Sequence, residues 1–281
     1  MTLPRMAAMA EVVWSPKSSR DWNDFASRIE MQFQRYEAAR YNAARSAYLA
    51  SIKSVVDTAA RTISVAMSAE MPTATIRFTL DDSSPTSQSM QYTQPLSIDK
   101  TTTIRAATFV GDAPASKVSE QDIFLHKAIF KSVALKNLSE RYDGGGLLPL
   151  TNGMRGTKSF NDGNWVGFHQ VDMEATVDLE KVVPLNRTRI SFLQNTASWI
   201  FFPPEVTVEI SEDGNKFVLL DRQKIAAATQ HEEPSIKEIV SEIGTGARFI
   251  RVRATNVGLC PDWHIAKGDK AWLFVDEIVV E

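Results

Sequence analysis

The sequence is poor in cysteine, in long apolar runs and in net charge, and each shortage excludes a class of protein. The single cysteine, Cys260, excludes an intrachain disulfide and a zinc site built from paired cysteines. No apolar run approaches the roughly 18 residues of a membrane-spanning helix. Lys and Arg total 31 against 34 Asp and Glu, a net charge of -3, without the basic excess typical of a nucleic-acid-binding domain. We therefore expect neither a membrane span nor a nucleic-acid partner.

What is present has the composition of a globular protein, with 43% hydrophobic and 23% charged residues. The residue pattern divides the chain into three parts. We predict a mainly β fold, in which a helical part at residues 1–58 precedes two β-sandwiches at residues 59–127 and 128–281. We call these the small sandwich and the C-terminal sandwich.

The helical part contains a stretch from Asp21 to about Val56 without Gly or Pro, which we read as helical. A shorter helix is predicted over Arg5–Val13, and Pro16 prevents its continuation. The longer stretch repeats apolar residues every three to five positions, so one helical face must cover another surface. That face consists of Trp22, Phe25, Ile29, Phe33, Tyr36 and Tyr41.

Strand patterns begin near Arg61. Segments such as ISVAM, TIRFTL and TTIRAATFV alternate apolar and polar residues, which is typical of an antiparallel sandwich with one buried face. Beyond Ala128 the pattern continues in ATVDL, TRISFLQ, VTVEISEDG and RFIRVRAT, separated by turns and without a long amphipathic helix.

The opening run LPRMAAMAEVVWSPKSSRDWNDFASRIEMQFQRY, residues 3–36, resembles the last βα unit of family 20 glycoside hydrolases, the β-N-acetylhexosaminidases. The resemblance implies that residues 1–58 are a remnant of a catalytic (β/α)₈ barrel. The run IRFTLDDSSPT, followed by YTQP and TIRA, is similar to the small Ig- or fibronectin-like sandwich that follows such barrels. It departs from that pattern at Phe78 and Asp82, where the family more often has Tyr and Gly.

The C-terminal sandwich is similar to discoidin-like (factor 5/8 type C, galactose-binding-like) modules appended to bacterial glycosidases. The runs that carry this resemblance are LTNGMRG, FNDGNWVGF, VDLE, the strand from Pro203 to Gly214, and AWLFVDEIVVE. Many such modules bind terminal sugars. The resemblance implies a jelly-roll fold, and we expect N-acetylhexosamine- or galactose-type glycans as partners.

The resemblance also implies that this chain is catalytically incomplete. Family 20 enzymes use an Asp-Glu pair on an earlier barrel strand, and a complete barrel needs about 250 residues. The one Asp-Glu dipeptide here, Asp276-Glu277, lies in an alternating strand where neighbours face opposite sides. We expect no catalytic residues, and no hydrolysis by this chain alone.

Sugar recognition requires an aromatic face and a few polar groups on loops. Trp199 follows a polar turn, and Trp263 and His264 lie in a loop with Gly and Pro, so we predict these three as carbohydrate-binding residues. Trp165 and Trp272 lie within strand motifs and are predicted to be structural.

Discoidin-like modules often hold a structural calcium ion, and the resemblance places three candidate ligands here: Asn152, Asp162 and Glu277. Calcium prefers several oxygen ligands that include carboxylates. Plain turn chemistry at Asn152-Gly153 and Asp162-Gly163 is the alternative.

Two functional hypotheses remain. In the first, the chain is the C-terminal accessory region, or a fragment, of a β-N-acetylhexosaminidase-like hydrolase, whose missing catalytic barrel is its partner. In the second, it is a free-standing carbohydrate-binding or adhesion protein. The first residues, MTLPRMAAMAEVVW, lack the pattern of a signal peptide. Family resemblance alone leads us to expect a periplasmic, cell-surface or secreted location.

Overall fold

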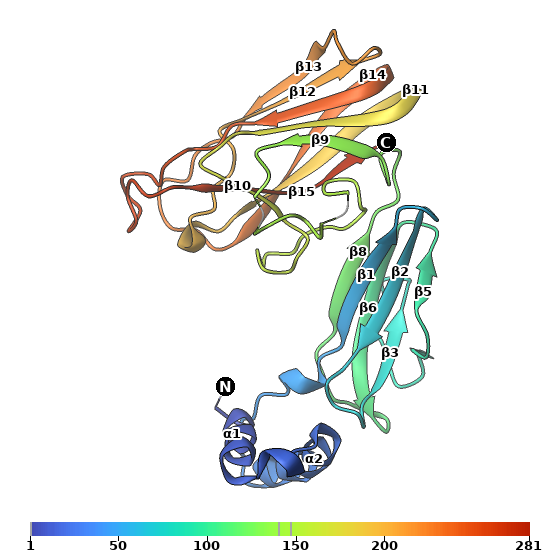
Figure 1. Cartoon of the computed structure of the whole chain (residues 1–281), viewed down its shortest axis with the longest axis vertical. Coiled ribbons are helices and arrows are strands. Elements are labelled where there is room, and N and C mark those ends of the chain that lie inside the picture. The colour runs from blue at the N-terminus through green and yellow to red at the C-terminus, as the bar shows by residue number, and fades with distance from the viewer. Residues whose placement is uncertain (1, 140, 147) are drawn as a thin grey trace. The chain divides into compact units, whose positions relative to one another are not determined.

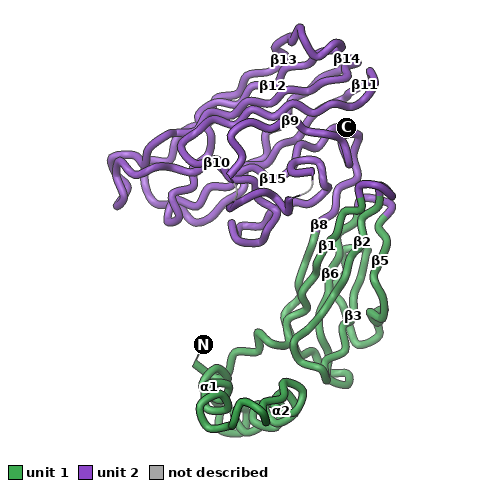
Figure 2. Tube along the Cα trace, in the orientation of Figure 1, with its two compact units in different colours: residues 1–57, 62–98, 102–121 green, residues 58–61, 99–101, 122–281 purple. Residues whose placement is uncertain are grey.

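The computed structural model describes residues 2–139, 141–146 and 148–281, and strands make up most of its regular structure, as predicted. The chain forms two compact units (Figure 2). The first contains the residues up to 57 with 62–98 and 102–121, and the second contains 58–61, 99–101 and 122–281. None of the helices within the described ranges is long and apolar enough to cross a membrane.

Two α-helices open the first unit (Figure 1). Helix α1 spans Arg5–Trp14 and helix α2 spans Trp22–Ala38. The Asp21 carboxylate caps α2 by accepting a hydrogen bond from the Asp24 amide at 2.8 Å. Short 3-10 turns follow each helix: η1 (Lys17–Ser19) and η2 (Ser46–Tyr48).

The prediction that the helical stretch extends to about Val56 is wrong. Helix α2 ends at Ala38, and Ser51–Asp57 form strand β1 of the small sandwich. The β-branched residues Ile52, Val55 and Val56 favour an extended backbone, and pairing with the next strand supplies the hydrogen bonds. The predicted boundary at residue 58 therefore falls after this strand, inside the strand pair.

Helix α2 covers part of the small sandwich. Its buried residues include Ile29, Phe33 and Tyr36, three to four positions apart and therefore on one face. The Phe33 ring lies edge-on to Tyr48 at 5.6 Å between centroids, within one apolar cluster that also contains Met71. The resemblance had assigned this face to the strands of a barrel, whereas in this chain it packs against residues next to the sandwich strands.

The small sandwich consists of two antiparallel sheets. In strand β2 every second residue is buried, as the alternating sequence predicts. One sheet has the order β1-β2-β5, and the other has the order β4-β3-β6-β7, with β8 also pairing with β6. The strands are β2 (Thr62–Ser68), β3 (Thr75–Thr79), β4 (Met90–Gln91), β5 (Leu96–Ile98), β6 (Thr102–Val110), β7 (Ala113–Pro114) and β8 (Ser119–Ile123).

The C-terminal sandwich is one hydrogen-bonded system of seven strands in the order β10-β15-β11-β14-β12-β13, with β9 also pairing with β11. Register shifts between Asp178 and Val183, and between Leu185 and Arg187, interrupt β11. The strands are β9 (Ser132–Lys136), β10 (Val166–His169), β11 (Met173–Gln194), β12 (Glu205–Ser211), β13 (Val218–Lys224), β14 (Ser235–Ala254) and β15 (Trp272–Val280).

Strand β11 organises the C-terminal sandwich. The first part of β11 pairs with β9 and the later part with β15, while β14 accompanies both parts. Fully buried side chains such as Phe168, Ile190 and Phe192 fill the interior. The predicted all-β sandwich is confirmed.

Phe33→Ala should destabilise the first unit by about 3 kcal/mol or more, because the deleted ring is 3% exposed and leaves a cavity. Calorimetry of the full chain would show a lower melting transition for that unit. Met31→Ala, two positions away and 59% exposed, is the control and should change stability by less than about 0.5 kcal/mol. Equal losses in both variants would contradict the packing of α2 described above.

Candidate functional site

Trp199 lies in the connection between β11 and β12, directly after the 3-10 turn η3 (Thr196–Ser198). Its backbone is left-handed, with φ of 60°, a conformation that bulky residues rarely adopt. The Trp199 amide donates to the Thr196 carbonyl at 3.1 Å, and the Trp199 carbonyl accepts from the Trp272 amide at 2.8 Å. The side chain is nevertheless 44% exposed. A fixed backbone thus presents an accessible aromatic ring.

Thr196 joins this connection to two further loops. Its carbonyl accepts a hydrogen bond from His264 Nε2 at 2.7 Å. Its hydroxyl accepts from the Glu232 amide at 3.2 Å, donates to the Glu232 carbonyl at 3.3 Å, and lies 3.4 Å from His231 Nδ1. Thr196 is fully buried, so these bonds are shielded from water. The loops brought together are 195–204, 225–234 and 255–271.

The side chains of Trp263 and His264 hold these loops together through hydrogen bonds and ring contacts, and neither side chain is open to solvent over most of its surface. The Trp263 indole N–H donates to the Ala228 carbonyl at 2.9 Å, and its ring lies edge-on to Phe201. His264 is 3% exposed, and its Nδ1 accepts from the Ala266 amide at 3.0 Å. Both imidazole nitrogens are therefore occupied. Of the three predicted carbohydrate-binding residues, the structure leaves Trp199 the most accessible.

The residue pattern does not mark His231 or Glu232 as site candidates, and the structure places both beside Thr196. The His231 ring is exposed and lies 5.3 Å from Trp263 between centroids, in an edge-on arrangement. Glu232 accepts a hydrogen bond from Gln194 at 2.7 Å. The run HEEP that contains them has a turn-like composition, but only the fold brings it next to Thr196, 35 residues earlier in the chain.

The predicted calcium ligands are arranged in two places. Glu277 is fully buried and accepts a hydrogen bond from the Gly153 amide, next to Asn152, at 2.8 Å. Asp162 bonds within its own turn, accepting from the amides of Thr157 and Asn164. Within the described ranges, no group of three or more His, Cys, Asp or Glu side chains is arranged to hold a metal. Calcium binding by this set of residues stays a prediction.

Asp276 and Glu277 face different partners, as alternation along β15 requires. Asp276 accepts from the Gly156 amide at 3.1 Å and pairs with Arg155 Nε at 3.2 Å. Burial raises the pKa of Asp276 to about 7, although the Arg155 guanidinium acts in the opposite direction. Both carboxyl groups are at most 2% exposed, so neither is open to a substrate in this structure.

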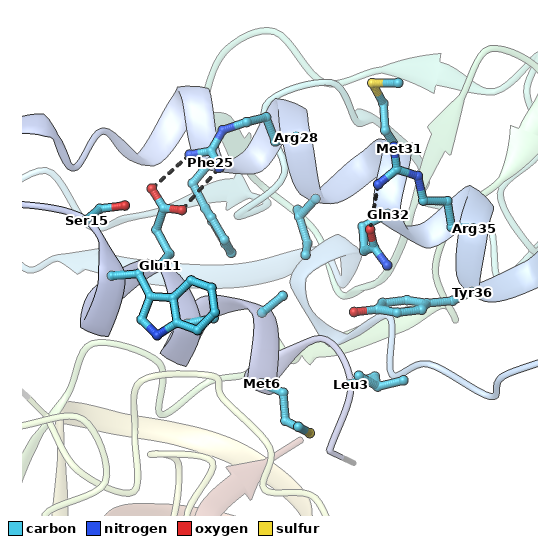
Figure 3. A pocket seen from close by; sticks show the side chains of 14 residues that line it. Leu3, Met6, Glu11, Ser15, Phe25, Arg28, Met31, Gln32, Arg35 and Tyr36 are labelled. Carbon is cyan, nitrogen blue, oxygen red and sulfur yellow. Dashed lines mark hydrogen bonds and ion pairs between the residues drawn. The ribbon is translucent and has the colours of Figure 1, made fainter.

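A groove of about 740 Å³ runs between α1 and α2, and Figure 3 shows the side chains that line it. Arg28 forms two hydrogen bonds with the Glu11 carboxylate, at 2.8 and 3.1 Å, and these lower the pKa of Glu11. The pair connects the two helices across the groove. Trp14, at the end of α1, is 86% exposed.

The small sandwich matches the model of a known domain family. Residues 57–120 match the model of the chitobiase/beta-hexosaminidase C-terminal domain. This agrees with the resemblance carried by the IRFTLDDSSPT run. No curated protein matches the chain.

Among solved structures, the chain is similar to the module CpGH89CBM32-4 produced by Clostridium perfringens, with 17% identity and a TM-score of 0.38 over 56% of this chain and 98% of that one. A second structure of that module, in complex with glcNAc-alpha-1,4-galactose, has 16% identity and a TM-score of 0.33 over 56% and 94%. Chitosan-binding module 2 from Paenibacillus sp. IK-5, in complex with chitotriose, has 14% identity and a TM-score of 0.32 over 55% and 98%. At identities and TM-scores this low, the ligands of these modules are not assigned to this chain.

Stability should fall as pH rises from about 4 to about 7 by an amount that depends on Asp276. Its pKa is raised from 3.8 to about 7, so between these values the folded chain holds a proton that the unfolded chain has lost. The free energy of unfolding is therefore higher at the acidic end of this pH range. Urea unfolding at each pH measures the slope, which Asp276→Asn should flatten and the exposed-site control Asp162→Asn should preserve. Identical slopes for wild type and Asp276→Asn would contradict the raised pKa.

Proposed function

We propose that this chain is an accessory region of a β-N-acetylhexosaminidase-like glycoside hydrolase and that its C-terminal sandwich binds carbohydrate through Trp199. The single observation that carries the binding proposal is the accessible Trp199 ring on a backbone fixed at both its amide and its carbonyl. The match of residues 57–120 to the chitobiase/beta-hexosaminidase C-terminal domain supports the connection to such a hydrolase.

The surroundings of Trp199 suit a sugar. A pyranose presents a C–H face that packs on an indole ring, and its hydroxyl groups need donors and acceptors nearby. Exposed His231 and Glu232 lie on the loop that Thr196 holds beside η3. Together they offer a ring nitrogen and a carboxylate. In this proposal N-acetylhexosamine- or galactose-type glycans are the ligands, and the protein acts in the periplasm or at the cell surface, where such glycans occur.

Helix α1 supports the accessory role over a free-standing carbohydrate-binding or adhesion protein. None of its residues is buried, and Met9, Val13 and Trp14 are each more than two-thirds exposed. A helix that is apolar on several sides is normally covered. In the accessory proposal a catalytic barrel covers it and carries out the hydrolysis, so this chain alone binds without cleaving. A free-standing binding protein has no use for such a surface.

Trp199→Ala should weaken glycan binding about tenfold, because a stacked aromatic ring contributes about 1 kcal/mol beyond its buried area. Titration calorimetry with oligosaccharides ending in N-acetylglucosamine, N-acetylgalactosamine or galactose measures the effect. Trp14→Ala, which removes an exposed tryptophan from α1, is the matched control and should bind like wild type. Undiminished binding by Trp199→Ala would remove this residue from the site. Hydrolysis of a chromogenic N-acetylglucosaminide above the blank would overturn the non-catalytic assignment.

The double substitution Val13→Asp and Trp14→Ser should reduce self-association and the fluorescence of a hydrophobic dye, because it removes exposed apolar surface from α1. Stability should change by less than about 0.5 kcal/mol, since neither residue is buried. Val110→Asp, on the small sandwich and 39% exposed, serves as the control. Dye binding unchanged from wild type would mean that the face is already covered in the isolated chain, which favours the free-standing alternative.

A further inference from the structure

Glu277 is a fully buried carboxylate held by two donors. Its Oε1 accepts from the Gly153 amide at 2.8 Å and from His126 Nε2 at 2.9 Å. The side chains of His126 and Glu277 are 2% and 0% exposed. We propose that His126 takes the place of a metal ion at this carboxylate, so that a calcium-independent clamp closes the second unit by joining residues 126–128 to strand β15.

The orientation of the His126 ring is set by backbone groups. Its Nδ1 receives the Ala128 amide at 3.2 Å and the Val280 amide at 3.3 Å. Because amides only donate, Nδ1 is the accepting nitrogen and Nε2 carries the hydrogen that faces Glu277. The ring thus directs a donor at the carboxylate, where a calcium site would need further oxygen ligands.

The backbone carbonyl oxygens and the Asn152 side-chain oxygen around Glu277 each already accept a hydrogen bond from an N–H group. The carbonyls of Leu150, Thr151 and Gly153 accept from the amides of Ile278, Phe130 and Phe124, at 2.8 to 2.9 Å. The Asn152 side chain is used on both sides, with its oxygen accepting from the Met154 amide and its nitrogen donating to the Gly144 carbonyl. Calcium takes six to eight oxygen ligands. These groups leave too few free oxygens for such a shell, because of the two Glu277 carboxylate oxygens only Oε2 lacks a hydrogen-bond partner in the described structure.

The clamp connects three segments that are distant in the sequence. The Lys127 amide donates to the Val280 carbonyl at 2.8 Å, beside the bond from Val280 to His126. The Gly153 amide brings the 150–154 loop to the same carboxylate. Without His126, Glu277 would remain buried with a single donor, and an underpaired buried charge is strongly destabilising.

The test compares the melting temperature of the full chain in 5 mM calcium chloride and in EDTA. The melting temperature of wild type should differ by less than about 1 °C between the two conditions. His126→Ala should melt about 5–10 °C lower in EDTA, given the usual relation between stability and melting temperature for a unit of this size. Calcium should not restore that loss, because the Gly153 amide still donates to Glu277 Oε1 and the neighbouring carbonyl oxygens stay paired with N–H groups. His126→Gln, whose amide can donate to Glu277, should melt between the two, and His169→Ala, at an exposed histidine, should melt like wild type.

A rise of more than about 3 °C for wild type in calcium would overturn the proposal, as would a His126→Ala variant as stable as wild type in EDTA. If His126→Ala does not fold, the calcium response of wild type and the position of His126→Gln decide the question. A melting temperature of His126→Gln equal to that of wild type would support the donor role of His126. A melting temperature equal to that of His126→Ala would contradict it. These readouts require no glycan and stand apart from the test of Trp199.

Discussion

Strand β11 pairs with β9, β14 and β15, and the C-terminal sandwich depends on that pairing. The strand continues through two register shifts, and its first part pairs with β9 while its later part pairs with β15. Its last residue, Gln194, precedes η3 and Trp199. The candidate carbohydrate-binding loop is therefore attached to a well-paired strand, which limits how far its backbone can move.

Buried polar groups decide which loops are fixed. Thr196 and Glu277 are both fully buried, and each holds together segments that are far apart in the sequence. A buried polar atom is costly unless it is paired, so the loops that supply the partners are held in place. At Thr196 this leaves Trp199 accessible. At Glu277 it joins residues 126–128 to the last strand, β15.

The first unit combines a well-packed helix with an uncovered one. Helix α2 buries Ile29, Phe33 and Tyr36 in a cluster with Tyr48 and Met71. Helix α1 is joined to α2 by the Glu11–Arg28 pair and buries no residue. This contrast supports an accessory role, in which part of the unit packs within the chain and part packs against a larger catalytic body.

The sequence by itself determined the mainly β fold, the two sandwiches and the amphipathic face of α2, because these follow from periodicity and turn residues along a local stretch. The sequence also predicts Trp199 as a carbohydrate-binding residue, which stays a prediction. It did not place β1, since a stretch free of Gly and Pro is compatible with helix and strand alike, and pairing with β2 decided between them. Only the tertiary structure showed that Trp263 is tied to Ala228 and His264 to Thr196, 35 and 68 residues away. Exposure depends on such distant partners, which local residue patterns do not record.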